Sequence, residues 1–219
     1  MKQKTTTKKE LFQSLCWTSL LFLIYLSIFD FLSSTPLIFN FVEYPTPSMD
    51  STFPELDVKF QRFWKSEGIN CLFLGSSMVD TGLEPRFFEE RINKKLGTNY
   101  KCFNFGFSSS MVEVSGSIGN TIQNTTDIDL VLWGISPIDM DPNFKQTRPI
   151  ANMPAFSYYN GNPTIVGWLY THFSLPWIIG SLPHLQNDSY IEQLDYYNGV
   201  LDDRGVRRLT SIGKMKTGE

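Results

Sequence analysis

Apolar residues first gather in a long run near the start of the chain. Four lysines lie among the first nine residues, and an almost unbroken apolar segment follows over residues 11–32. At a rise of about 1.5 Å per residue, its central part, Leu11 to Phe29, nearly spans a hydrocarbon core of about 30 Å as a helix. A cleaved signal peptide, the main alternative, has a shorter apolar region and a small-residue cleavage site, and no clear Ala-x-Ala is present. We therefore expect an uncleaved transmembrane signal anchor.

Charged and proline-rich segments on either side of this run indicate how the chain is organised. Because basic residues tend to stay on the cytoplasmic side, residues 1–10 are predicted to be a cytoplasmic tail. A single-pass protein of this orientation places its main domain outside the cytoplasm or in a lumen. Residues 33–54 hold several Pro, Ser and Thr residues, which suits an extended linker. The folded domain is then expected over residues 55–219.

Short apolar runs alternate with helical patterns in the first half of this domain. The runs Ile69–Leu74, Tyr100–Phe105 and Ile128–Trp133 are typical of buried parallel strands. The segments Glu84–Leu96 and Ser110–Gln123 between them have helical spacing of apolar residues. A β-α-β-α-β order predicts an α/β fold with a doubly wound, flavodoxin-like parallel sheet in three α/β/α layers. Ligands of such sheets bind beyond the carboxyl ends of the strands.

Two later segments allow more than one interpretation. Thr164–Leu182 is apolar and aromatic, but Pro176 interrupts it. We expect a buried or membrane-surface helix broken at this proline, and a second membrane span is the alternative. Residues 141–162 hold several prolines and aromatic residues, so they form either a binding loop or a disordered segment.

Composition and charge exclude several classes of protein. The 219 residues are 42% hydrophobic and 15% aromatic, which is enough for one sizeable core and too apolar for a disordered chain. A formal net charge of -3 argues against a nucleic-acid partner, because binding to phosphates depends mostly on Lys and Arg. The three cysteines and two histidines lack the spacing of zinc ligands. No metal and no cofactor are therefore expected.

Two of the cysteines fall on strands that are expected to be neighbours. Cys71 and Cys102 can form a disulfide if the registers of the two strands match. Free cysteines are also common in protein cores. We expect two buried free thiols, with the disulfide as the alternative.

Glycine and serine follow each of the three predicted strands. The three turns contain Gly75–Ser77, Asn104–Ser109 and Gly134–Ser136. Parallel strands bring such turns to one edge of the sheet. Acyl transfer needs this kind of meeting point, with a nucleophile, backbone N–H groups that stabilise an oxyanion, and side-chain donors on neighbouring loops.

From Ile69 to Asp141 the chain resembles the SGNH, or GDSL-like, superfamily of esterases and acyltransferases, in its membrane-anchored forms. Gly75-Ser76-Ser77 is similar to the first block of that family, which implies that Ser77 is the nucleophile. Similarity to the second and third blocks implies that Ser109 and Ser136 form the oxyanion hole. The residues that would support these turns are Gly75, Asn104, Gly106 and Gly134.

The chain departs from the family pattern at three places. Ser109 stands where glycine is usual, and Ser136 stands where an asparagine donor is usual. The Asp-x-x-His block that supplies the general base is not present, since neither His172 nor His184 follows an aspartate by three residues. Either histidine can still pair with Ser77 in space, because a triad is defined by geometry. We expect a divergent member that is truncated or lacks this block, with its base unknown.

The resemblance implies a function at the cell envelope. The expected activity is that of a serine esterase or O-acyltransferase acting on O-acyl groups of a cell-surface polysaccharide or glycolipid. Its substrate would be an acylated glycan or a lipid-linked molecule, and the sequence does not indicate which protein partners it has. The alternative is a catalytically inactive protein of the same fold that serves as an accessory or binding protein in cell-surface glycan assembly. A third interpretation is a transport or assembly role for the anchor and Thr164–Leu182.

Overall fold

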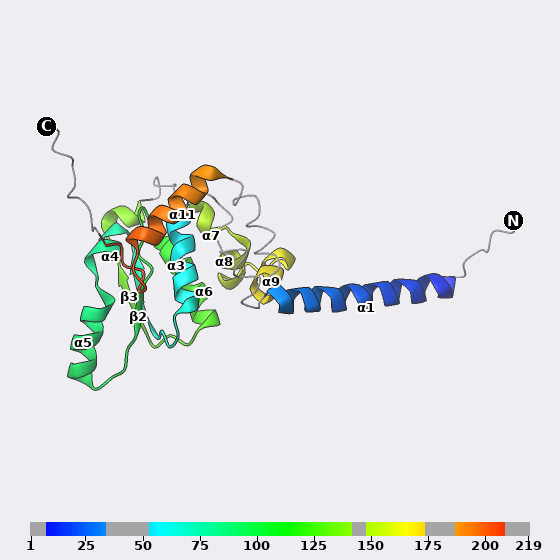
Figure 1. Ribbon diagram of the computed structural model, residues 1–219, viewed down its shortest axis with the longest axis horizontal. Coiled ribbons are helices and arrows are strands. Elements are labelled where there is room, and N and C mark those ends of the chain that lie inside the picture. Colours follow the sequence, from blue (N-terminus) through cyan, green and yellow to red (C-terminus); the bar gives the residue numbers. More distant parts are fainter. Residues whose placement is uncertain (1–7, 34–52, 142–147, 174–186, 209–219) are drawn as a thin grey trace.

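A small parallel sheet lies at the centre of the folded region. The computed structural model describes residues 8–33, 53–141, 148–173 and 187–208 of the chain (Figure 1). The three strands of the sheet are β1 (Cys71–Gly75), β2 (Cys102–Asn104) and β3 (Leu130–Gly134), in the spatial order β2-β1-β3. Strand β1 pairs in parallel with both neighbours. The prediction of an α/β chain with a parallel sheet is confirmed at this level.

Three helices connect the strands. A short helix, α4 (Ser77–Gly82), follows β1 directly, and α5 (Pro85–Leu96) and α6 (Val112–Thr125) come before β2 and β3. The bounds of α5 and α6 agree closely with the predicted helices. Helix α5 begins with its proline in the first turn and ends at Gly97, whose φ of 66° is left-handed. Both signals are local, which explains why this helix can be recognised in the sequence.

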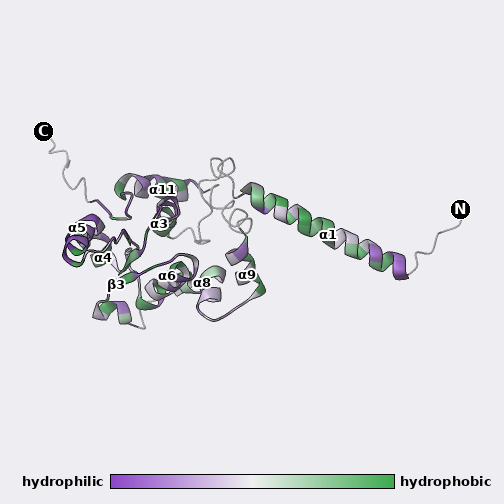
Figure 2. Ribbon diagram, turned by 90° about the horizontal axis from the view of Figure 1, so that it is seen from below, coloured by the Kyte–Doolittle hydropathy of each residue, from purple (hydrophilic) through white to green (hydrophobic). Residues whose placement is uncertain are grey.

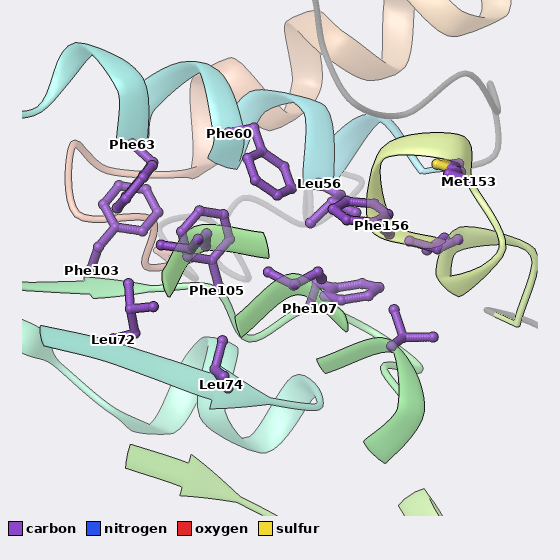
Figure 3. Packing of buried hydrophobic residues seen from close by; sticks show 14 of the residues in the cluster. Leu56, Phe60, Phe63, Leu72, Leu74, Phe103, Phe105, Phe107, Met153 and Phe156 are labelled. Carbon is purple, nitrogen blue, oxygen red and sulfur yellow. The ribbon is translucent and has the colours of Figure 1, made fainter. Parts of the chain in front are cut away.

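Helices cover both faces of the sheet. Figure 1 shows α5 on one side of the strands, with α6 and α3 (Pro54–Lys65) on the other. Successive residues of β1 point to opposite faces, so Leu72 packs towards α3 and α6, whereas Phe73 packs against Phe88 of α5. Figure 3 shows the larger core between α3, α6 and the sheet, with the labelled residues Leu56, Phe60, Phe63, Leu72, Leu74, Phe103, Phe105, Phe107, Met153 and Phe156.

Helix α3 has no counterpart in the sequence prediction. Its polar residues alternate with apolar ones, and yet the buried set includes Glu55, Asp57, Lys59 and Gln61. A surface helix keeps its polar residues on one exposed face, and this one-sided pattern is what reveals such a helix in a sequence. Leu56, Phe60 and Phe63 of α3 do recur at helical spacing and pack in the main core, but the sequence prediction did not include this signal. Because α3 is covered on several sides, its polar residues are buried as well, which that spacing does not indicate.

A last helix covers α3. Helix α11 (Asp188–Val200) packs on α3 through Tyr190 and Leu194, which form a small cluster with Val58. The Tyr190 hydroxyl donates a hydrogen bond to Asp57 Oδ2 at 2.7 Å. The segment after α11 then returns to the sheet, where the Asn104 N–H donates to the Arg204 carbonyl at 2.8 Å. Residues 201–208 therefore lie along the outer side of β2.

The two strand cysteines are joined. Cys71 and Cys102 lie directly opposite each other in the β1/β2 register, with their Cα atoms 4.2 Å apart, and they form a disulfide. The expectation of two free thiols is therefore wrong. The third cysteine, Cys16, is free and exposed. The register of two strands that are separated by a helix decides this pairing, and no local pattern reports it.

The region after β3 is more structured than the sequence indicates. It contains a 3-10 helix at Pro137–Met140 and the helices α7 (Arg148–Ala151), α8 (Pro154–Tyr159) and α9 (Ile165–His172). Ile150 and Phe156 are fully buried in the main core. Part of the expected loop over residues 141–162 therefore belongs to the core. Residues 142–147 lie outside the described residues.

Helix α9 lies at the surface within the segment Thr164–Leu182. The side chain of Ile165 is 80% exposed and that of Val166 is 53% exposed. These fractions exclude the buried alternative for this part of the helix. Helix α9 ends before Pro176, which lies outside the described residues.

The N-terminal helix matches the predicted anchor. Helix α1 (Lys8–Ser33) is long and apolar enough to cross a membrane, and it is the one helix among the described residues that meets this condition. Figure 2 shows mostly apolar colours along its length and polar colours at its N-terminal end. A membrane association of this segment is therefore supported, while its orientation remains a proposal.

Candidate functional site

The turns that follow the three strands meet around one pocket. The pocket has a volume of about 560 Å³ and lies at the carboxyl edge of the sheet. The turn after β1 contributes Ser77, the turn after β2 contributes Ser109, and the turn after β3 contributes Ser136. The full lining consists of Ser76, Ser77, Met78, Ser109, Ser110, Ser136, Pro137, Ile138 and Asp139. The structure thus brings together the three serines that the sequence singled out.

Glycines allow helix α4 to begin directly on the strand ends. A Cβ atom at Gly75 or at Gly134 would lie 2.5 Å from Val79 Cγ2, and one at Gly106 would lie 2.5 Å from the Asp80 backbone nitrogen. Such distances are too short for any side chain. The φ of Gly75, 150°, is also one that other residues rarely adopt. These glycines therefore set the position of the first turn of α4, which carries Ser77.

Asn104 fastens helix α4 to the turn after β2. The side chain is fully buried, and its Nδ2 donates to the carbonyl oxygens of Val79 at 2.8 Å and Leu83 at 2.9 Å. Its Oδ1 accepts the Gly106 N–H at 2.8 Å. Asn104 does not line the pocket. It stabilises the elements that do.

Ser77 is the accessible hydroxyl of the first turn. It is the first residue of α4 and is exposed, whereas the adjacent Ser76 is buried at the helix N-cap. On the other side of the pocket, the Ser110 hydroxyl is buried and lies 2.6 Å from the Ser115 hydroxyl. Of these three serines, Ser77 is the one placed to meet a ligand.

Ser109 has an unusual backbone conformation. Its φ of 62° is left-handed, and among the described residues it is the one non-glycine residue with a positive φ. This conformation costs an L-residue with a side chain about 1–2 kcal/mol. Glycine adopts a positive φ most readily, and glycine is usual at this position in the family that the sequence resembles.

Ser136 makes a hydrogen bond within its own turn. Its backbone N–H already donates to Asp139 Oδ2 at 2.8 Å. Its hydroxyl oxygen is buried and has no hydrogen-bond partner among the described residues. Asp139 is 8% exposed and is the one ionisable side chain among the described residues that line the pocket.

The described histidine lies away from the pocket. His172 is the last residue of α9, where its ring stacks on Trp168 at a centroid distance of 4.8 Å. Its Nδ1 lies 2.9 Å from both the Thr171 hydroxyl and the Trp168 carbonyl oxygen. Helix α9 is well separated from α4 in Figures 1 and 2. The structure therefore does not pair His172 with Ser77, and His184 lies outside the described residues.

A buried network of charges lies beneath helix α4, and the sequence prediction missed it. The Lys59 ammonium is fully buried and lies 2.6 Å from Asp80 Oδ1. It also donates to the Gly106 carbonyl, and its Nζ lies 3.9 Å from Glu55 Oε1. Arg207 pairs with Glu55 and lies 3.0 Å from Asp80 Oδ2. Two acidic and two basic side chains thus neutralise one another.

Burial shifts the ionisation of this network. It lowers the pKa of the Lys59 ammonium, and the Asp80 and Glu55 carboxylates oppose that shift. Burial also raises the pKa of the Glu55 carboxyl, against the effects of Lys59 and Arg207. The one sequence signal for this cluster was the spacing of four residues between Glu55 and Lys59, which also occurs in exposed helices.

The arrangement offers hydroxyl groups and backbone donors, and none of the described residues that line the pocket is a histidine. Among the described residues, no cluster of three or more His, Cys, Asp or Glu side chains is placed to hold a metal ion. The chemistry that these residues can support is binding of a polar ligand or attack by the Ser77 hydroxyl on an ester.

Comparisons with known proteins do not identify a family. No protein-family model, no curated protein and no solved structure matches this chain. The relation to SGNH proteins therefore rests on the three sequence blocks and is a proposal.

Proposed function

We propose that this protein is an SGNH-like serine esterase or O-acyltransferase that acts on O-acyl groups of a cell-surface polysaccharide or glycolipid. One observation carries the proposal: Ser77, Ser109 and Ser136 come from three separate strand ends and line the same pocket. The helices on both faces of the parallel sheet favour a flavodoxin-like, three-layer arrangement.

The proposed chemistry begins at Ser77. Its Oγ attacks the ester carbonyl carbon, and the backbone N–H groups of Ser77 and Ser109 with the Ser136 hydroxyl stabilise the oxyanion. The alcohol leaves with the proton that Ser77 gave up, and water or an acceptor hydroxyl then takes the acyl group, while its own proton returns to the Ser77 oxygen. Among the lining residues, Asp139 is the one side chain that can accept the Ser77 proton. A carboxylate is a weaker base than an imidazole, so we expect slow turnover.

The second candidate function is binding without catalysis. The specific observation in its favour is that the described residues lining the pocket include no histidine that could act as the general base. In this case the serine turns would hold a glycan or an acylated ligand during assembly of the cell surface. Both functions use the same pocket and differ in whether Ser77 reacts.

Two independent features support an extracytoplasmic location. The lysines that precede α1 favour a cytoplasmic N-terminus. The Cys71–Cys102 disulfide is typical of an oxidising compartment, because cytosolic thiols are generally kept reduced. The proposed protein is therefore anchored by α1, with its pocket on the far side of the membrane.

A fluorophosphonate probe distinguishes the two functions. The full chain, purified in detergent, is incubated with the probe, and the modified residue is located by mass spectrometry. Catalytic function predicts labelling at Ser77 that is lost in Ser77→Ala and retained in the matched variant Ser76→Ala. A folded protein that is labelled at no serine would contradict the esterase proposal and favour binding. In that case Ser77→Trp, which fills the pocket, should abolish binding of an O-acetylated oligosaccharide in calorimetry.

A further inference from the structure

One arginine near the end of the described chain touches both turns that matter most for the pocket. Arg207 Nε lies 3.0 Å from Asp80 Oδ2, and its Nη2 donates to the Ser108 hydroxyl at 3.3 Å. Asp80 lies in helix α4, three residues after Ser77, and Ser108 immediately precedes Ser109. A single guanidinium group therefore connects the turn of the nucleophile with the turn of the oxyanion hole.

The same arginine is anchored from a third element. Its Nη2 pairs with Glu55 of α3, and its side chain is 18% exposed while that of Asp80 is fully buried. The positive charge of its guanidinium group is shared between the Glu55 and Asp80 carboxylates, and the same group donates to the Ser108 hydroxyl. From the opposite side, Lys59 holds Asp80 Oδ1 and the Gly106 carbonyl. The two cations thus fix α4 to the turn after β2.

Backbone contacts hold the segment that carries Arg207 independently of its side chain. Arg62 Nη1 donates to the Leu201 carbonyl at 2.6 Å, and the Asn104 N–H donates to the Arg204 carbonyl at 2.8 Å. Removal of the Arg207 side chain should therefore leave residues 201–208 in place. A variant of Arg207 can therefore change the pocket locally without unfolding the domain.

We propose that Arg207 is a positioning residue, which fixes the separation of Ser77 and Ser109 by bridging Asp80 and Ser108. The left-handed conformation of Ser109 gives the bridge a physical role, because an unfavourable backbone conformation persists only where surrounding contacts hold it. Residues 201–208 are then part of the site, although none of them lines the pocket. The inference rests on the proposed function where the reactivity of Ser77 is the readout.

Three variants of the full chain test the proposal. Arg207→Ala removes the bridge, and Arg207→Lys keeps a positive charge that can pair with one carboxylate but cannot span to Ser108. Arg208→Ala is the matched control, because Arg208 pairs at the surface with Asp202 at 2.7 Å and Glu84 at 3.0 Å. For each protein we would measure thermal stability, the rate of fluorophosphonate labelling at Ser77, and hydrogen exchange of the amides in residues 77–83 and 107–110.

A positioning role predicts a split between stability and reactivity. Arg207→Lys should keep most of the thermal stability, and yet label at least about tenfold more slowly, because small displacements of reacting groups have large effects on rate. Both turns should exchange faster in Arg207→Ala and Arg207→Lys and remain unchanged in Arg208→Ala. The proposal is overturned if Arg207→Lys restores the labelling rate together with stability, or if exchange in the two turns does not change. If Arg207→Ala does not fold, Arg207→Lys gives the answer.

The same experiments distinguish a failure of the proposed esterase function from a failure of the proposed role of Arg207. A wild-type protein that is not labelled at Ser77 would refute the esterase proposal alone. Hydrogen exchange then decides the inference by itself. Faster exchange confined to the two turns in the Arg207 variants supports the bridge, and uniform or unchanged exchange refutes it.

Discussion

Removal of the disulfide between β1 and β2 gives the sharpest test of the fold. The double variant Cys71→Ala with Cys102→Ala leaves the strands paired but opens the covalent loop that joins them. The two cysteines are separated by 31 residues in the chain. A disulfide restricts the unfolded chain and lowers its entropy. For a loop of this length, the effect stabilises the folded state by about 4 kcal/mol at 25 °C. Folded domains have a total stability of about 5–15 kcal/mol, so this effect is a large fraction of it.

The free energy of unfolding can be measured by urea titration of the full chain in detergent, followed by tryptophan fluorescence. We expect the double variant to lose about 4 kcal/mol, and wild-type protein treated with a reductant to approach the same value. Cys16→Ala is the control, because Cys16 is free and exposed in α1. Its unfolding free energy should equal that of the wild type.

Counting reactive thiols tests for the disulfide without a measurement of unfolding free energy. A maleimide reagent should modify one cysteine in the denatured, unreduced chain and three after reduction. Three reactive thiols before reduction would refute the disulfide. A double variant that unfolds within about 1 kcal/mol of the wild type would refute the assigned magnitude, since the chain-entropy estimate for this loop is several times larger.

Three further predictions concern the support of the pocket, and each is measured as a change in unfolding free energy. Gly134→Ala should destabilise by about 1–3 kcal/mol, because the new Cβ would lie 2.5 Å from Val79 Cγ2, whereas Gly199→Ala, where nothing lies within 4 Å, should be neutral or slightly stabilising. Equal effects of the two variants would contradict this. Asn104→Ala should cost about 3 kcal/mol or more, because it leaves two carbonyls and one N–H without their buried partner. A loss under about 1 kcal/mol would mean that other groups replace those bonds. Lys59→Met should cost about 3–5 kcal/mol, because it leaves buried carboxylates with one cation fewer, and an unchanged stability would show that the network is not formed.

Much of the fold is readable in the sequence because its signals are local. The apolar run of α1 predicts a long helix by length alone, and the three short apolar runs predict strands, of which β1 and β2 are fully buried and β3 is partly exposed. Helix α5 carries its own start and stop residues, Pro85 and Gly97. The meeting of the three serine turns also follows from the sequence, since parallel strands place their carboxyl ends at one edge. These features depend on residues that are close in the chain or on a general rule of topology.

Tertiary structure alone decides the contacts that join distant segments. The Cys71–Cys102 pairing depends on the register of two strands, and a shift by one residue would separate the sulfur atoms. The burial of Lys59 depends on the helices and turns that surround α3 on several sides. The pattern of residues within α3 does not indicate that this lysine is buried. The contact between Arg207 and Asp80 joins residues far apart in the sequence. The sequence states which side chains the chain carries, but only the packing of the elements determines which charges are removed from water together and therefore have to pair.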